Sequence, residues 1–341
     1  GSAAVMASDL SLVSTSGLNV QACGDAHISN FGLFASAERT LVFDVNDFDE
    51  TLPAPFDYDV RRLAASVAVA ALASGDSSKK ARKAAKQAAE TYRTVMGALA
   101  QMPRIDVWNL KVDASFLLKN LGTSPLLGVV QKAVKDAGRS SSASAVSKLT
   151  TVVNGQRRFR EDPPLLTTIP EGERDKVIDL AATAYERYLQ TLPPDRIGLL
   201  AHYSFEDIAR KVVGVGSVGT IALVLLLKSG DNDPLVLQIK QANASVLEPY
   251  AGASQFANHG ERVVVGQRVL QTSGDPFLGW VASAETRNKG SVDFYFRQLK
   301  DMKGSLDVDA LAGRILADYG MLCAATLARA HARIGDPSLI S

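Results

Sequence analysis

Near its start the chain carries GDAHISN at residues 24–30, and FDVNDFDE follows at residues 43–50. The first segment ends a short alternating run at residues 18–24, which predicts a strand that feeds a tight turn. In such a turn Asp25 can orient or deprotonate an attacking hydroxyl, while the amide oxygen of Asn30 binds a magnesium ion beside it. The spacing by itself is common and is also typical of an ordinary turn.

The second segment places four carboxylates within seven residues, after an apolar run that predicts a strand. They belong to Asp44, Asp47, Asp49 and Glu50. Neighbouring anions repel one another unless a cation neutralises them. Magnesium binds through one or two carboxylates together with nucleotide phosphates, so we expect a metal site in this loop. An exposed acidic loop and a carboxylate-based hydrolase site are the alternatives.

A glycine-rich segment, GVGSVG at residues 214–219, lies between two predicted strands. Most dinucleotide-binding folds need a helix directly after such glycines, so this placement argues against them. A hairpin that covers phosphates is the functional interpretation, with Gly214, Gly216, Ser217 and Gly219 at the nucleotide. A simple tight turn is the structural alternative.

Lys240 ends the strand that follows this hairpin, where its ammonium can reach an α- or β-phosphate. Such a lysine needs a carboxylate that holds it in position, and we expect Glu248 to do so, with Glu261 as the other candidate. We interpret His27 and His331 as structural. In ordinary kinases the glycine loop and lysine precede the catalytic Asp and Asn, whereas here they follow.

Apolar periodicity predicts an α+β chain. Helical spacing predicts helices over residues 58–75, 77–95, 171–191 and 309–333. Short apolar runs predict strands over residues 221–227, 235–239, 262–265 and 293–299. We therefore expect a helical part at residues 1–200, a β-rich part at 201–304, and a closing helix at 305–341 that packs back on the first part.

The composition excludes several classes of protein. The chain has 341 residues, 46% of them apolar, which supports a sizeable core. Its formal net charge of +1 indicates no nucleic-acid partner. Its most apolar run, at residues 221–227, is far shorter than the ~20 residues that span a bilayer, so we expect no membrane partner. Two distant cysteines and no visible secretory signal fit a reducing cytoplasm. The sequence indicates no oligomeric state.

These motifs carry a family resemblance. Residues 24–30 resemble the catalytic loop of aminoglycoside phosphotransferases and choline kinases. Asp47-Phe48-Asp49 resembles their metal-binding segment, and Asp59 stands where those enzymes commonly carry another Asp. The whole chain is similar to a bacterial family named domain of unknown function 2252. The similar stretches are residues 23–33, 42–66, 214–220, 235–242, 262–280, 294–304 and 327–336.

The chain departs from that family at two positions, because Ile221 and Val265 stand where it usually carries an arginine and an acidic residue. The family's sequence usually extends beyond both ends of this chain. The resemblance implies a two-lobed, protein-kinase-like fold that is circularly permuted, with the helical lobe first and the β-rich lobe inserted late. We therefore expect Asp25 and Lys240 to face each other across one cleft.

The resemblance also implies roles for individual residues. Asp25 would be the catalytic base or orienting group, and Asn30 and Asp47 would hold Mg²⁺, with Asp44 or Asp49 as an extra ligand. The glycine loop and Lys240 would hold the phosphates of ATP. The backbone around Arg297, Gln298 and Leu299 would receive the adenine.

The function that follows is an ATP- and Mg²⁺-dependent phosphotransferase that acts on a hydroxyl of a small molecule. Two alternatives use the same cleft: a nucleotide-binding regulatory pseudokinase, which has no turnover, and an enzyme that transfers AMP.

Overall fold

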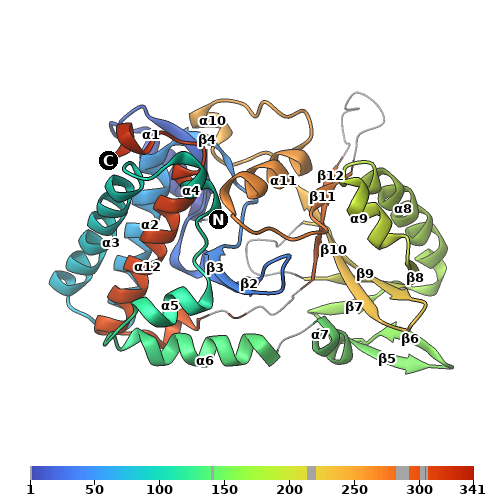
Figure 1. Cartoon of the computed structure of the whole chain (residues 1–341). Coiled ribbons are helices and arrows are strands. Elements are labelled where there is room, and N and C mark those ends of the chain that lie inside the picture. The colour runs from blue at the N-terminus through green and yellow to red at the C-terminus, as the bar shows by residue number, and fades with distance from the viewer. Residues whose placement is uncertain (1, 140–141, 213–219, 282–291, 300–303, 305) are drawn as a thin grey trace.

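The computed structural model describes residues 2–139, 142–212, 220–281, 292–299, 304 and 306–341. Figure 1 shows two halves side by side, one rich in helices and one built on a β-sheet. The predicted α+β class is confirmed. The two halves meet where β2, β3 and α11 approach β10 and β12.

Three long helices build the helix-rich half: α2 (Phe56–Ala73), α3 (Ser78–Leu99) and α12 (Gly313–Ala332). Their apolar faces meet in one core, as the helical spacing of these residues predicts. Gly320 of α12 lies so close to α2 that a Cβ atom there would come within 2.9 Å of the Val67 side chain. The closing helix therefore returns to the helix-rich half, packed tightly against α2.

Two antiparallel strand pairs present the loops near the start of the chain. β1 (Asn19–Ala22) pairs with β4 (Leu52–Pro55), and β2 (Phe31–Ala35) pairs with β3 (Leu41–Val45). The GDAHISN segment thus connects β1 to β2, and the acidic segment connects β3 to β4. The two pairs are separate two-stranded sheets, and both loops run from one pair to the other.

A six-stranded antiparallel sheet forms the other half, in the order β11-β12-β10-β9-β8-β7. Its strands are β7 (Leu166–Thr168), β8 (Tyr203–Lys211), β9 (Ala222–Ser229), β10 (Pro234–Ala242), β11 (Gly279–Trp280) and β12 (Asp293–Gln298). Successive side chains of a strand point to opposite faces. In β10, Ile239 packs into the core beneath α8 (Glu171–Leu189), whereas Gln238 and Lys240 point to the other face and line the space between the halves.

Helices α8 and α9 (Pro194–Leu200) pack on this sheet rather than on the helix-rich half (Figure 1). Tyr188 of α8 stacks on Phe296 of β12, with ring centroids 4.2 Å apart. The division that we predicted at residue 200 therefore falls inside one packed unit. The amphipathic pattern of α8 shows that one face is buried, but it does not show against what.

The remaining elements are shorter. They are α1 (Ser2–Ser11), α4 (Arg104–Asn109), α5 (Ala114–Asn120), α6 (Leu126–Arg139), α7 (Ser142–Leu149), β5 (Thr150–Val153), β6 (Gln156–Phe159), α10 (Glu248–Ala251), α11 (His259–Leu270), α13 (Pro337–Ile340) and two 3₁₀ turns, Ile28–Asn30 and Val308–Ala310. Within the described residues, no helix has both the length and the apolar character needed to cross a membrane.

The predicted helices correspond to α2, α3, α8 and α12, and three of the predicted strands correspond to β9, β10 and β12. The strand predicted at residues 262–265 is wrong, because this segment lies inside α11. Its β-branched valines favour a strand locally. The side chain of Asn258 accepts a hydrogen bond from the Glu261 amide and caps the helix, and burial of Val263 and Val264 stabilises it.

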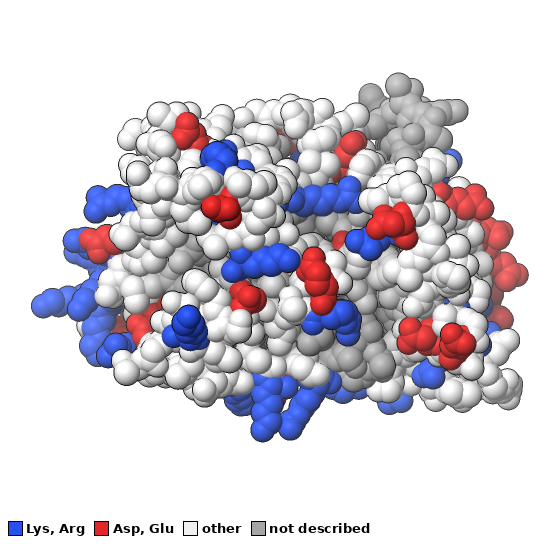
Figure 2. Space-filling model, in the orientation of Figure 1, with Lys and Arg blue, Asp and Glu red and all other residues white. Residues whose placement is uncertain are grey.

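The near-neutral net charge hides a separation of charge over the surface. Figure 2 shows basic side chains along the edge formed by α3 and acidic side chains along the opposite edge, over α8. Between these edges, on the face shown, both signs are interspersed. This face therefore presents no continuous basic surface of the kind that tracks a nucleic-acid backbone.

Candidate functional site

A cavity of about 490 Å³ lies between the two halves of the molecule. Its lining includes five of the predicted site residues: Asn30, Asp47, Lys240, Gln298 and Leu299. The first two come from the loops of the helix-rich half, and the others come from the sheet half. Tertiary folding thus brings together segments that lie more than two hundred positions apart in the sequence.

Lys240 joins the two halves through an ion pair. Its ammonium donates to Oδ2 of Asp49 at 2.6 Å, and the Tyr295 hydroxyl donates to Oδ1 of the same carboxylate, also at 2.6 Å. Burial disfavours the charge on Lys240, but Tyr295, Asp49 and Asp47 outweigh burial and raise its pKa. Burial likewise opposes the charge on Asp49, yet the lysine and tyrosine lower the pKa of that carboxyl. Both groups are therefore charged, and the acidic loop is tied to β10.

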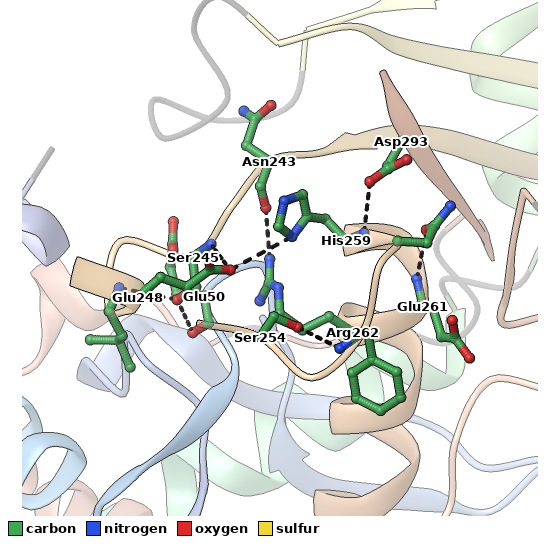
Figure 3. Close-up of polar contacts among 12 residues, drawn as sticks. Glu50, Asn243, Ser245, Glu248, Ser254, His259, Glu261, Arg262 and Asp293 are labelled. Carbon is green, nitrogen blue, oxygen red and sulfur yellow. Dashed lines mark hydrogen bonds and ion pairs between the residues drawn. The ribbon is translucent and has the colours of Figure 1, made fainter. Parts of the chain in front are cut away.

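Glu248 is not the partner of this lysine, so that prediction is wrong. Its carboxylate instead accepts from the Ser245 amide at 3.4 Å and lies 3.7 Å from Nδ1 of His259 (Figure 3). Sequence proximity suggested Glu248, but β10 directs Lys240 toward the helix-rich half, where Asp49 lies.

Asp47, two residues before Asp49 in the same loop, lines the cavity. Although its side chain reaches solvent there, the surrounding protein and the charge of Asp49 raise the pKa of the Asp47 carboxyl, against the influence of Lys240. Asp47 and Asp49 together carry two negative charges beside the single positive charge of Lys240, and a metal ion can neutralise the remainder. The site is therefore suited to a cation shared with an anionic ligand.

Two buried polar atoms beside the cavity have no hydrogen-bond partner among the described residues. They are Oδ1 of Asn46, next to Asp47, and Nε2 of Gln238, which lies on the same face of β10 as Lys240. Buried polar atoms are nearly always paired in folded proteins, so each exception calls for a ligand or a water. An oxygen acceptor and an amide donor at this place fit a metal ion and a nucleotide.

Asp44 does not join the other carboxylates. It is buried in a short ion pair with Arg329 of α12, and it is not among the cavity's lining residues that the structure describes. Burial raises the pKa of the Asp44 carboxyl, although the guanidinium of Arg329 opposes this. Arg329 also donates to the backbone oxygen of Leu270. The metal-ligand role expected for Asp44 is therefore replaced by a structural one, because β3 turns its side chain into the core.

Asp25 lies in the loop after β1, where Nε of Arg62 donates to its Oδ1 at 2.6 Å. Asn30 turns back in the same loop, and its side-chain amide donates to the Asp25 backbone oxygen at 2.9 Å. Asn30 lines the cavity, whereas Asp25 is not among its described lining residues. The loop thus has the compact form predicted for it. That Asp25 faces Lys240 across the cleft stays a prediction.

The start of this loop is held by Asp59 of α2, which the end of α12 contacts through His331. The buried carboxylate of Asp59 accepts from the amides of Cys23 at 2.6 Å and Gly24 at 3.0 Å, and Nε2 of His331 lies 3.1 Å from it. Nδ1 of His331 is 2.8 Å from the Tyr92 hydroxyl. The structural role expected for His331 therefore has a physical basis. Cys23, Asp59 and His331 could together hold a metal, but hydrogen bonds within the protein already explain their arrangement.

His27 and Gly24 shape the loop itself. His27 caps the 3₁₀ turn by accepting from the Ser29 amide, and burial lowers the pKa of its imidazole. Gly24 has a φ of +87°, and a Cβ atom there would lie 2.2 Å from the backbone oxygen of Glu50. The acidic loop and the GDAHISN loop are therefore in contact, which only glycine permits at this position.

Arg262, which our sequence reasoning had not selected, anchors the acidic loop from α11. Its buried guanidinium donates to the backbone oxygens of Thr51 at 2.7 Å and of Asp49 at 2.8 Å. It also donates to the backbone oxygen of Asn243 at 2.8 Å (Figure 3). Ser245 adds a hydrogen bond to the backbone oxygen of Glu50 at 2.7 Å. These contacts hold Asp49 where Lys240 can reach it. No local pattern marks Arg262, since its partners are distant backbone atoms.

The expected nucleotide contacts are only partly described. Gly214, Gly216, Ser217 and Gly219 lie outside the described residues. Gln298 and Leu299 line the cavity, but their backbone amides already donate to the Asp275 carboxylate and to the Val236 backbone oxygen, respectively. Adenine would therefore have to use other groups at this edge of the cavity.

Other lining residues that sequence reasoning missed are Asn46 and Gln238, and for Arg297 it considered the backbone but not the side chain. The alternation of a strand carries a signal for two of them, because Gln238 shares a face with Lys240, and Arg297 shares one with Tyr295. Burial disfavours the charge on Arg297, but Tyr295 and nearby carboxylates outweigh it and raise its pKa. Arg297 is therefore a further permanent cation at the cavity.

Comparison with known proteins identifies the family of this chain, but it gives no information about an activity. No curated protein and no solved structure matches the chain. One family model matches residues 1–341, and its description is "Uncharacterized protein conserved in bacteria (DUF2252)". The chain, with its cavity between a helix-rich half and a sheet half, therefore belongs to the DUF2252 family of bacterial proteins.

Proposed function

We propose that this protein is an ATP- and Mg²⁺-dependent phosphotransferase that acts on a hydroxyl of a small molecule. The observation that carries the proposal is the convergence of Asn30, Asp47 and Lys240 at one cavity, with Asp49 paired to the lysine. Phosphoryl transfer needs little covalent chemistry from the protein, and it depends on groups that position the phosphates and neutralise their charge. A lysine, two carboxylates and an amide at one place meet that need.

The charge of the cavity supports a polyanionic ligand. Among its described lining residues five side chains are cationic: Arg39, Arg196, Lys211, Lys240 and Arg297. Two are anionic, Asp47 and Asp275. A cavity with this excess of positive charge attracts a triphosphate, while the carboxylate of Asp47 keeps a place for the accompanying metal ion.

The roles follow from the positions. Asp47 and Asn30 would hold magnesium, with the unpaired Asn46 oxygen beside them, and the ion would neutralise charge between the phosphates. Lys240, fixed by Asp49, would contact the phosphates from the sheet side. Asp25 would orient the acceptor hydroxyl. Its ion pair with Arg62 fixes the position of the carboxylate, which suits a group that orients the hydroxyl.

A circularly permuted kinase-like fold explains the order of these motifs. The end of α12 is held beside the start of the GDAHISN loop through His331 and Asp59. A chain that ran from α12 directly into this loop would have the order of an ordinary kinase, with the glycine loop and lysine ahead of the catalytic loop. Permutation of this kind is tolerated when the new ends lie at the surface and close together.

One observation favours the second candidate, a nucleotide-binding protein without turnover. The Asp25 carboxylate is engaged by Arg62, and it is absent from the described lining of the cavity. Binding needs only Lys240, the metal site and the cations, whereas turnover also needs Asp25 to reach the acceptor. An enzyme that transfers AMP would use the same cavity.

The test separates binding from chemistry. Binding of MgATP is measured by calorimetry, and transfer is followed with a bacterial metabolite extract and ATP labelled on either its γ- or its α-phosphate. A product labelled from the γ-phosphate supports a kinase, one labelled from the α-phosphate means AMP transfer, and binding without product means a regulatory protein. Lys240→Met and Asp47→Asn should weaken binding and abolish transfer, while Glu186→Gln, at an exposed position of α8, is the control. Failure to bind MgATP would overturn the proposal.

A further inference from the structure

A second cavity, of about 760 Å³, lies on the opposite face of the sheet from Lys240. One wall is the inner side of α8, with Val177, Ala181 and Ala184. The other wall is the sheet, where Leu223 and Ile239 point away from the nucleotide cavity. The helix and the sheet therefore meet fully at one end, around Tyr188 and Phe296, and leave a space at the other.

The sheet wall is one cross-strand row. Thr167 pairs with Arg210, Arg210 pairs with Leu223, and Leu223 pairs with Ile239. Directly opposed residues of antiparallel strands place their side chains on the same face. Across the sheet, the four side chains change from polar Thr167 and charged Arg210 to apolar Leu223 and Ile239. The row thus leads from a polar residue on the edge strand β7 and a cation on β8 to apolar side chains on β9 and β10.

The rim of the cavity exposes large apolar side chains. Leu180 is 62% exposed, Ile221 49% and Val212 47%, and all three are lining residues. Scattered exposed apolar residues are normal, but three around the mouth of one apolar cavity mark a binding site more than a plain surface. The volume also falls in the range of about 300–1,000 Å³ that is usual for small-molecule pockets.

The charged side chains that line the cavity have one sign. Arg210 and Lys211 are the only charged residues among the described lining residues, and both are cationic. Arg210 pairs with Glu173 at 3.0 Å, where both side chains are more than half exposed. An exposed ion pair of this kind contributes little to stability. Its arginine can therefore exchange that carboxylate for the carboxylate of a ligand.

We propose that this cavity binds an amphiphile with one apolar chain and an anionic head, of the class of medium-chain fatty acids. The chain lies between α8 and the row of Leu223 and Ile239, and the carboxylate meets Arg210 at the mouth. A neutral apolar molecule would not use the cation on β8, and a polar ligand would not match the apolar side chains on β9 and β10. The proposal does not rest on phosphoryl transfer, because Leu223 and Ile239 point away from the face that carries Lys240, although Lys211 is a described lining residue of both cavities.

The test uses decanoate and the full chain. Binding is measured by calorimetry, with octanoate and decanol as comparison ligands. We expect Ala184→Trp, which fills the cavity, to abolish decanoate binding. Ala182→Trp is the matched control, since Ala182 is exposed on the same helix and does not line the cavity, and it should bind as the wild type does. Far-ultraviolet circular dichroism and thermal unfolding establish that both variants are folded.

Two further comparisons test the orientation of the ligand. Each methylene that enters the cavity should tighten binding about fourfold, so decanoate should bind on the order of tenfold more tightly than octanoate. Arg210→Gln should weaken decanoate but leave decanol unchanged. Absence of decanoate binding, equal binding by both tryptophan variants, or equal effects of Arg210→Gln on the acid and the alcohol would each overturn the proposal.

Discussion

Replacement of Arg262 by methionine tests whether α11 holds the acidic loop in place. The change removes three hydrogen bonds, to the backbone oxygens of Asp49, Thr51 and Asn243. A hydrogen bond from a charged donor contributes about 1.5–3 kcal/mol net. Burial opposes this contribution, as the lowered pKa of Arg262 shows. Methionine also keeps much of the apolar packing, so we expect a loss of about 4 kcal/mol in the free energy of unfolding.

The assay is equilibrium urea unfolding followed by tryptophan fluorescence. Trp108 lies in the helix-rich half and Trp280 in the sheet half, so the signal reports on both. Arg268→Met is the matched control on the same helix. Arg268 donates a hydrogen bond to the Leu278 oxygen, and we expect its loss to cost about 1–2 kcal/mol. Hydrogen exchange of residues 46–51 should accelerate only in Arg262→Met. A loss below about 1 kcal/mol, or unchanged exchange in this loop, would refute the reasoning.

Four further predictions concern single positions. Gly24→Ala should lower the free energy of unfolding by about 3 kcal/mol or more, because its Cβ atom would clash with the Glu50 backbone oxygen. Gly75→Ala is the control: at φ +90° and with no neighbour within 4 Å, it should cost about 1 kcal/mol. Equal shifts of the two variants in thermal unfolding would contradict this. Because the pKa of His27 is lowered in the folded protein, the unfolded chain binds the imidazole proton more readily. The free energy of unfolding should therefore fall as the pH drops below about 6.5. In thermal unfolding between neutral pH and about pH 5, His27→Gln should flatten this dependence. Burial raises the pKa of the Cys23 and Cys323 thiols, so a thiol reagent should react with them only after unfolding, and rapid labelling of the native protein would show that they are accessible. Lys240→Met should weaken MgATP binding by on the order of tenfold or more under the proposed function, as calorimetry can establish.

Local features of the fold were predictable because they depend on residues near one another in the chain. The helical spacing in residues 58–75 and 77–95 and the alternation around Lys240 specify α2, α3 and β10 in any environment that buries their apolar faces. The tight GDAHISN turn was likewise predictable, since Gly24 and Asn30 carry their conformational demands with them.

The partners of charged side chains were not predictable in the same way. Glu248 was the nearest reasonable carboxylate in sequence, yet Lys240 pairs with Asp49, 191 positions away. Asp44 stands in the same acidic run as Asp47, but the alternation of β3 and the guanidinium of Arg329 take it into the core. A pattern of acidic residues shows that cations are needed, and it does not show which cation serves each one.

Residues 262–265 and α8 show the same limit for packing. Three consecutive valines favour a strand on local grounds, whereas the Asn258 cap and burial in the core make the segment helical. The apolar pattern of α8 shows that one side of the helix is buried, but it does not show the partner. Only in the folded protein does Phe296 of the sheet lie where the Tyr188 ring can stack on it. The local preference of a residue for helix or strand contributes only a fraction of a kcal/mol. Burial of an apolar side chain against a distant segment contributes several times that energy, so tertiary packing outweighs local preference.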